Sequence, residues 1–132
     1  MSRQITSHIA NGCNEKLTIE AHGQPGSGGA NHKYMIYGFH TATNADADAH
    51  QRDETSCMIL FQNGPIAESG VNGVTQEALL AIVIDRLQCF QAGPYACREN
   101  ALALTKLEEA AHWLEHRTKA RLARGIEGTH TV

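Results

Sequence analysis

One aromatic ring, one amide and two guanidinium groups in the C-terminal half of the chain have the chemistry that binds a nucleotide. Phe90 offers a stacking face, and Asn100 offers a hydrogen-bonding group for a base edge. Arg117 and Arg121 offer planar donors that match phosphate oxygens. On one helix Arg117 lies roughly 25 Å from Asn100, because they are 17 residues apart (117 − 100). One chain cannot gather these groups into one small pocket, whereas two helical hairpins packed head to tail can.

A purely structural role explains the same residues. Asn100 can cap a connection between two helices, and a basic helix end suits the negative pole of the helix dipole. Taken alone, the residue types favour this structural role. The nucleotide site is therefore a hypothesis that needs support from outside these four positions.

The other polar clusters do not match a catalytic or metal site. His112 and His116 have the i, i+4 spacing of a helical chelate, but they lack the acidic residue of a HExxH pattern and a third ligand. The acidic stretch 46–54 lacks the glycine and the final glutamate of a calcium loop. The glycine-rich residues 24–30 lack the lysine of a phosphate-binding loop. We expect a binding protein with no catalytic residue, no bound metal and no cofactor.

Two helices must position the candidate residues. The sequence predicts one helix over residues 75–92, with Thr75 as its N-cap, and a second over residues 95–124 that stops at Gly125. Gly93 and Pro94 separate them, as a helix-ending residue followed by a helix-starting one. A link this short predicts an antiparallel helical hairpin.

The first predicted helix carries apolar residues on nearly all sides, which one partner helix cannot cover. We expect cover from the N-terminal half of the chain and from another subunit. In that half, residues 16–21, 33–39 and 57–62 read as strands, with a short edge strand at 65–68. Residues 1–14 read as an irregular arm and 41–55 as an exposed loop. The prediction is an oligomeric α+β fold: a small N-terminal antiparallel sheet (1–70) followed by a helical hairpin (71–132), in one compact unit.

Composition excludes several classes of function. The formal net charge of −3 gives no general attraction to nucleic acid, and basic residues gather only near the end of the second helix. Aromatic residues make up 5% of the chain, which is few for a monomeric core. The four cysteines show no CxxC spacing, and no signal peptide or membrane span is visible. These features predict reduced thiols in a cytoplasmic protein that binds neither DNA nor membrane.

The two helices and the tail resemble a known family. Residues 70–118, GVNGVTQEALLAIVIDRLQCFQAGPYACRENALALTKLEEAAHWLEHRT, and the tail RGIEGTH (124–130) are similar to the helical-hairpin domain of phage anti-defence sponges. Its members include the Thoeris anti-defence sponge and a smaller anti-CBASS cyclic-nucleotide sponge, which is mostly hairpin. Because this chain adds the β-rich residues 1–70, it looks like the Thoeris type.

The resemblance implies a homodimer or homohexamer that binds glycocyclic ADP-ribose without degrading it. That messenger is made by Toll/interleukin-receptor-type enzymes, and its capture in the cytoplasm of the infected bacterium keeps the effector inactive. The spacing of the family's site is matched by four residues, which implies that Phe90 stacks on adenine, that Asn100 makes a polar contact, and that Arg117 and Arg121 hold the phosphates, drawn from two protomers.

Three other functions stay open at this point. A sponge for cyclic di- or trinucleotides would use the same fold. A hydrolase that cleaves the messenger would need a base or metal, with His112 and His116 as the first suspects. A DNA-binding regulator would use the basic helix end. The apolar first helix and the negative net charge argue against this function.

Overall fold

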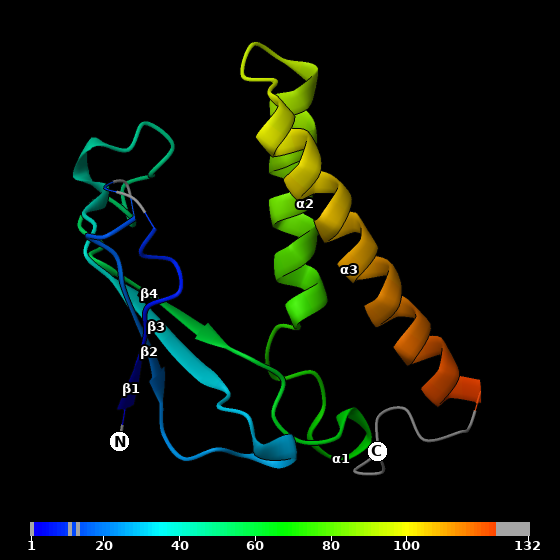
Figure 1. The fold of residues 1–132 in the computed structure, drawn as a ribbon. Coiled ribbons are helices and arrows are strands. Elements are labelled where there is room, and N and C mark those ends of the chain that lie inside the picture. Colours follow the sequence, from blue (N-terminus) through cyan, green and yellow to red (C-terminus); the bar gives the residue numbers. More distant parts are fainter. Residues whose placement is uncertain (1, 11, 13, 124–132) are drawn as a thin grey trace. The chain divides into compact units, whose positions relative to one another are not determined.

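The structure is a computed structural model that describes residues 2–10, 12 and 14–123 (Figure 1). The chain divides into two compact units, Met1–Asn63 and Gly64–Val132. The first unit is built on a β-sheet and the second on helices. The predicted α+β class, with the sheet preceding the helices, is therefore confirmed.

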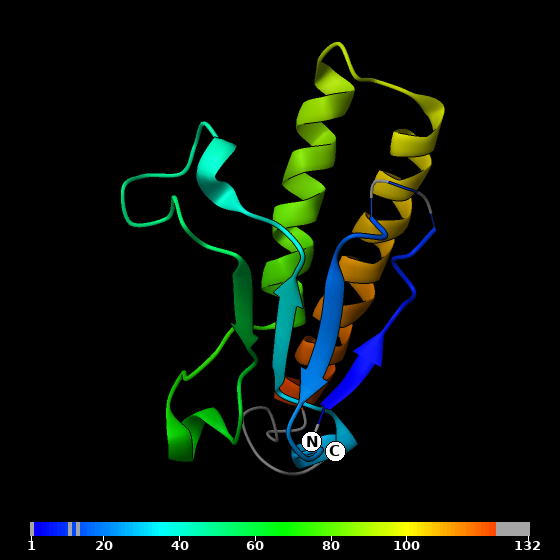
Figure 2. The same cartoon turned by 90° about the vertical axis from the view of Figure 1, so that its left-hand side faces the viewer.

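The sheet is a four-stranded antiparallel meander in the order β1-β2-β3-β4 (Figure 2). Its strands are β1 (Ser2–Ile5), β2 (Thr18–His22), β3 (Lys33–Tyr37) and β4 (Ser56–Leu60). Each pairs with its neighbour in sequence. The predicted strands at 16–21, 33–39 and 57–62 correspond to β2, β3 and β4, with ends that differ by the margin usual for element boundaries.

Strand β1 corrects the expectation that residues 1–14 form an irregular arm. It pairs with β2, placing Arg3 opposite Ala21. The Arg3 side chain also donates from Nη2 to Asn31 Oδ1 at 2.9 Å, and Asn31 is only 9% exposed. An edge strand is held through backbone hydrogen bonds on one side, so its side chains need not alternate between apolar and polar. The largely polar residues of β1 therefore carry no period-two signal.

One face of the sheet is apolar. The register places Ile19 opposite Ile36 and Ala21 opposite Tyr34. The Tyr34 ring meets the Phe61 ring edge-on, with centroids 5.6 Å apart. Ala21, 1% exposed, is the only buried apolar residue in the part of the chain that the structure describes. The sheet unit therefore buries little apolar surface by itself.

Gly38 follows β3 in a conformation that requires glycine. Its φ is +98°, in the left-handed region. A Cβ at this position would lie 1.9 Å from the carbonyl oxygen of Lys16 and 3.2 Å from Leu17 Cα. The close approach of these two backbone segments therefore depends on the missing side chain.

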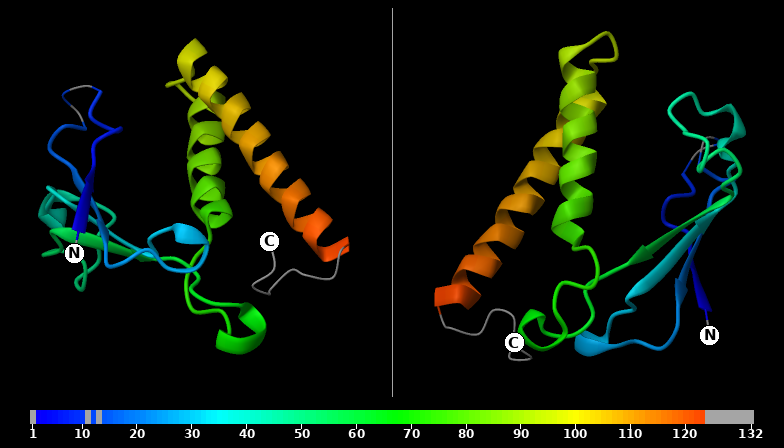
Figure 3. Two further views of the ribbon diagram at one scale, coloured as in Figure 1. Left: turned by 60° about the horizontal axis from the view of Figure 1, so that its bottom comes forward. Right: turned by 180° about the vertical axis from the view of Figure 1, so that it is seen from behind.

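The second unit contains α1 (Ile66–Ser69), α2 (Gln76–Ala92) and α3 (Arg98–Ala123). Helices α2 and α3 run antiparallel and are joined by residues 93–97, as the predicted hairpin required (Figure 3). Within this unit they pack on each other. The hairpin is the element that positions all four candidate residues.

Helix α1 replaces the edge strand predicted at 65–68. Pro65 precedes it, and the backbone nitrogen of Ser69 donates to the Pro65 carbonyl oxygen at 2.8 Å. Proline has no N–H for a strand ladder, but it suits the start of a helix. Gly70 follows with φ +70°, which ends the single turn.

The predicted start and end of the first helix are confirmed. The Thr75 hydroxyl accepts a hydrogen bond from the backbone nitrogen of Ala78 at 3.1 Å, which caps α2. Helix α2 ends at Ala92, directly before Gly93. The predicted end of the second helix at Gly125 lies outside the described residues.

The start of the second helix differs from the prediction that Pro94 initiates it. Helix α3 begins at Arg98, because residues 94–97 form the turn that reverses the chain. Cys97 takes the capping place: its sulfur accepts a hydrogen bond from the Asn100 backbone nitrogen at 3.4 Å. Gln91 Oε1 in turn accepts from the Cys97 backbone nitrogen at 2.9 Å.

The hairpin covers its own apolar surface only in part. Helix α2 has no buried residue, and Ile82 and Val83 remain 59% and 43% exposed. Helix α3 shows a half-buried stripe at alternating spacings of three and four residues, typical of packed helices: Asn100, Leu104, Leu107, Ala111, Leu114 and Thr118. The apolar surface of α2 is therefore larger than its own unit can bury.

Candidate functional site

The end of the hairpin near residues 93–97, here called the tip, gathers an aromatic pair. The rings of Phe90 and Tyr95 meet with centroids 6.1 Å apart and planes at 72°. Tyr95 is 72% exposed, whereas Phe90 is half-buried. The guanidinium carbon of Arg86 lies 5.4 Å from the centroid of the Phe90 ring, within cation–π range. The tip therefore has an aromatic surface held by neighbouring side chains.

Asn100 belongs to the same tip. Its Nδ2 donates to the carbonyl oxygen of Tyr95 at 3.3 Å. Within the described residues, its Oδ1 accepts no hydrogen bond. The donor half of the amide therefore holds the connection in place, as the structural interpretation expected, while the acceptor half remains available to a ligand N–H.

The two arginines lie at the other end of α3. Arg117 is exposed, whereas Arg121 is 7% exposed and continues the half-buried stripe. Since α3 is one uninterrupted helix, Arg117 is roughly 25 Å along its axis from Asn100. The structure therefore brings Phe90 and Asn100 together at the tip and keeps both arginines apart from them within one chain.

A surface ion pair near the two arginines lies on the side of α3 opposite Arg117. Lys119 Nζ lies 3.0 Å from Glu115 Oε1. The hydrogen bond and charge of Lys119 lower the pKa of the Glu115 carboxyl, although both side chains are well exposed. Lys119 is two residues after Arg117, a rotation of roughly 200° about the helix axis. The basic end of α3 thus has one paired cation on one side and Arg117 on the other.

Sequence reasoning missed Arg86 and Tyr95. Arg86 precedes Phe90 by four residues, so their i, i+4 spacing on a helix is a signal that could have found the contact. Tyr95 lies in the connection, whose backbone path no periodic pattern predicts. Its position depends on the Cys97 and Asn100 hydrogen bonds that close the turn.

The paired histidines contact an aromatic residue. The rings of His112 and His116 each meet the Trp113 ring at steep angles, with centroid distances of 5.6 and 5.7 Å. Among the residues that the structure describes, no three His, Cys, Asp or Glu side chains form a group that could hold a metal ion. Cys57, Cys89 and Cys97 carry free thiols, whereas Cys13 lies outside the described residues.

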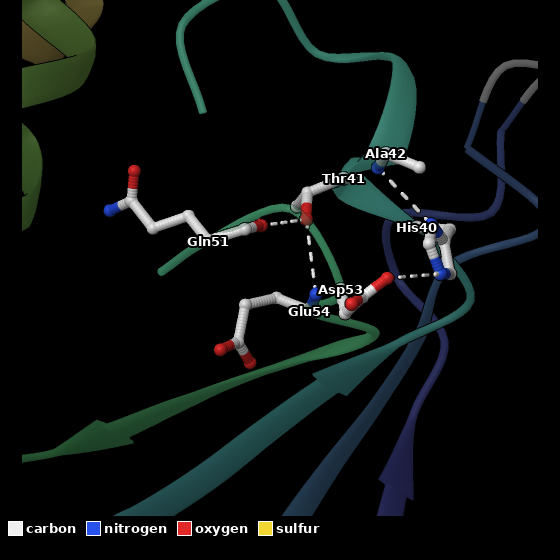
Figure 4. Close-up of polar contacts among 6 residues, drawn as sticks. All are labelled: His40, Thr41, Ala42, Gln51, Asp53 and Glu54. Atoms are coloured by element: carbon white, nitrogen blue, oxygen red, sulfur yellow. Dashed lines mark hydrogen bonds and ion pairs between the residues drawn. The ribbon is translucent and has the colours of Figure 1, made fainter. Parts of the chain in front are cut away.

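The acidic loop of the sheet unit closes on itself (Figure 4). The Thr41 hydroxyl donates to the Gln51 carbonyl oxygen and accepts from the Glu54 backbone nitrogen at 3.1 Å. His40 Nε2 lies 4.0 Å from Asp53 Oδ1. The loop borders an open cavity of about 440 Å³, lined by Phe39, Thr41, Asn44, Asp46, Ala47, Gln51, Glu54, Ser56 and Cys57.

Charge makes this cavity a poor place for a phosphate. Its lining residues include Asp46 and Glu54 and no lysine or arginine. Carboxylates repel an anion and give it no hydrogen-bond donors. The cavity is therefore not a candidate site for the phosphates of a nucleotide.

None of the helices formed by the described residues combines the length and apolar character that a membrane crossing requires.

Comparison with known proteins identifies the helical region. Residues 53–119 match the family model of the Acb2/Tad1 hairpin domain. A protein named Thoeris anti-defense 1, from Bacillus phage SBSphiJ7, is 60% identical over 70 residues. The aligned region is 53% of this chain and 49% of the relative, so this chain matches about half the length of that protein.

Proposed function

This chain belongs to the Acb2/Tad1 hairpin-domain family, and from that premise we propose that it is a phage anti-defence sponge. It binds and sequesters glycocyclic ADP-ribose in the cytoplasm of the infected bacterium and so blocks Thoeris signalling. The single observation that carries the proposal is the match over residues 53–119, supported by the name of a relative that is 60% identical over 70 residues.

The binding site is formed between two copies of the chain. The aromatic and amide groups lie at one end of the hairpin, and the two arginines lie at the other. A head-to-tail pair brings the tip of one protomer to the basic end of its partner. The exposed apolar surface of α2, including Ile82, supports such an assembly. The protein acts as a homodimer, or as a homohexamer built from such dimers.

Each residue type has a role in the proposed site. Phe90 stacks on the adenine ring, and the unoccupied Oδ1 of Asn100 accepts a hydrogen bond from a ligand N–H. Arg117 and Arg121 pair with the two phosphates, for which bidentate guanidinium groups are well shaped. A local positive charge of this kind is compatible with the negative formal charge of the whole chain, −3.

Sequestration requires tight binding and no chemistry on the ligand. A dissociation constant of ~1 nM corresponds to a binding free energy of about −12 kcal/mol, enough to remove a scarce messenger from its receptor. Phe90 and Asn100 supply neither a nucleophile nor a general base. The protein is therefore proposed to release the messenger unchanged when it is denatured.

Calorimetry of the purified protein with glycocyclic ADP-ribose, followed by denaturation and chromatography of the recovered ligand, tests the proposal. Tight binding with intact ligand supports a sponge. Binding with altered ligand makes the protein a hydrolase and directs attention to His112 and His116. No heat with this ligand, but binding of a cyclic di- or trinucleotide, supports the sponge of CBASS-type immunity instead.

A further inference from the structure

The single tryptophan of the chain lies on the same ridge of α3 as the two arginines. Trp113, Arg117 and Arg121 follow one another at intervals of four residues, and such neighbours on a helix have Cβ atoms about 5–6 Å apart. Side chains on a helix lean toward its N-terminus, so the surface next to Trp113 is within reach of Arg117. Trp113 and Arg117 are therefore surface neighbours one helical turn apart.

The indole is exposed and flanked by two histidine rings. Trp113 is 60% exposed, although it is among the largest apolar side chains in the protein. The His112 and His116 rings meet it at 71° and 70°, so neither imidazole stacks parallel over the indole. The two imidazoles flank the ring edge-on, and much of its surface remains open. A solvent-facing aromatic ring beside a cationic residue suits a nucleotide base or ribose next to a phosphate.

We propose that Trp113 is a ligand-binding residue of the same site, and that its indole supplies the aromatic face opposite Phe90 of the partner subunit. The adenine ring then lies between two aromatic rings, with its phosphates on Arg117. The inference rests on the proposed function, because it places Trp113 in the site between the tip and the basic end. It makes Trp113 a determinant of specificity for ligands that carry a base next to a phosphate.

Tryptophan fluorescence tests the inference directly, since every photon of indole emission comes from Trp113. Titration of the wild-type protein with glycocyclic ADP-ribose is expected to change the emission saturably, with the dissociation constant that calorimetry gives. Trp113→Ala is expected to weaken binding about tenfold or more, the usual effect of removing an aromatic ring under a base. Trp113→Phe is expected to restore most of the affinity.

Leu102→Ala is the matched control. Leu102 is another exposed apolar residue of α3, at 47%. It points to nearly the same side of the helix as Trp113, but it lies roughly 16 Å along the axis from it, because they are 11 residues apart (113 − 102). Its truncation is expected to leave the affinity unchanged. Light scattering of each variant shows whether the assembly is intact, and Trp113→Ala is expected to keep the wild-type mass.

Two outcomes overturn the role of Trp113 while the sponge function stands. In one, calorimetry shows binding but the emission is constant and Trp113→Ala binds normally. In the other, Trp113→Ala breaks the assembly, which makes Trp113 an interface residue. Absence of heat with both glycocyclic ADP-ribose and cyclic oligonucleotides would instead reject the proposed function itself.

Discussion

The two ends of the α2–α3 hairpin differ in how many contacts their candidate residues make within one chain. At the tip, Phe90 contacts both Tyr95 and Arg86, and Asn100 holds the connection through the Tyr95 carbonyl oxygen. At the other end, Arg117 and Trp113 are exposed, and α3 extends past the start of α2. The tip therefore has its contacts within one chain, whereas Arg117 and Trp113 at the basic end face solvent, as the proposed site between two copies requires.

Arg117→Ala is the change with the largest expected effect, and it tests whether the basic end binds the ligand. Loss of a charged hydrogen bond to phosphate costs about 1.5–3 kcal/mol, so binding of glycocyclic ADP-ribose should weaken roughly ten- to a hundredfold by calorimetry. The assembly should stay intact by light scattering, because Arg117 is exposed. Arg121→Ala should also abolish tight binding, but its buried side chain makes a loss of stability part of its effect.

Lys119→Ala controls for charge at the same end of α3. It removes one positive charge two residues from Arg117, on the opposite side of the helix, where Lys119 already pairs with Glu115. Its affinity should stay within about twofold of wild type. Equal weakening by both variants would mean that general electrostatic attraction, rather than a site at Arg117, binds the ligand.

Asn100→Ala tests whether the tip serves structure, ligand or both. It removes the hydrogen bond to the Tyr95 carbonyl oxygen, which is worth about 1 kcal/mol, so the melting temperature should fall by several degrees. If Oδ1 also contacts the ligand, affinity should fall about tenfold. Asn100→Asp keeps the acceptor and loses the amide donor, so it should have a lowered melting temperature but bind better than Asn100→Ala. If Asn100→Ala has a lowered melting temperature and full affinity, Asn100 is only a structural cap.

Thr75→Ala separates stability from binding at the basic end. It removes the N-cap of α2, and such a cap typically contributes about 1 kcal/mol to stability. The melting temperature should therefore fall by several degrees in a thermal scan. Affinity should be unchanged, because Thr75 has no part in the proposed site. Thr75→Ser, which keeps the accepting oxygen, should melt close to wild type.

Glu115→Gln has the smallest expected effect. Lys119 lowers the pKa of the Glu115 carboxyl in the folded state. The ion pair therefore stabilises the protein at pH values above the pKa that this carboxyl has in the unfolded chain. That stabilisation is lost as the pH falls through the lower pKa of the folded state. The pair is highly exposed, so solvent screens it. Thermal scans at neutral pH should show no resolvable shift, and the small difference from wild type should vanish in acid. A large shift would mean that Glu115 has a partner beyond Lys119.

Local signals in the sequence predicted the elements that local chemistry determines. The Thr75 cap, the end of α2 before Gly93 and the three central strands depend on side chains and spacings within a few residues. Strand β1 was missed because an edge strand is specified by backbone pairing with a distant segment. Helix α1 was missed because a single turn is too short for periodicity, and Pro65 suits both a strand edge and a helix start.

The candidate site was predictable only as a set of residue types. Residue type singled out the ring of Phe90 and the amide of Asn100, and the structure places both at the tip. The position of Tyr95 depends on how residues 93–97 turn, which side-chain patterns do not determine. Whether Arg117 meets Phe90 depends on a second copy of the chain, so it remains a prediction for the experiments above.

Gly38 has a consequence for how the protein tolerates substitution. Even an alanine methyl group would overlap the Lys16 carbonyl oxygen, and the positive φ adds strain for any L side chain. The obstacle is main chain, so no compensating mutation of the Lys16 side chain can relieve it. In a saturation library of the whole chain selected for soluble expression, position 38 should return almost only glycine, while the side chain at position 16 varies freely.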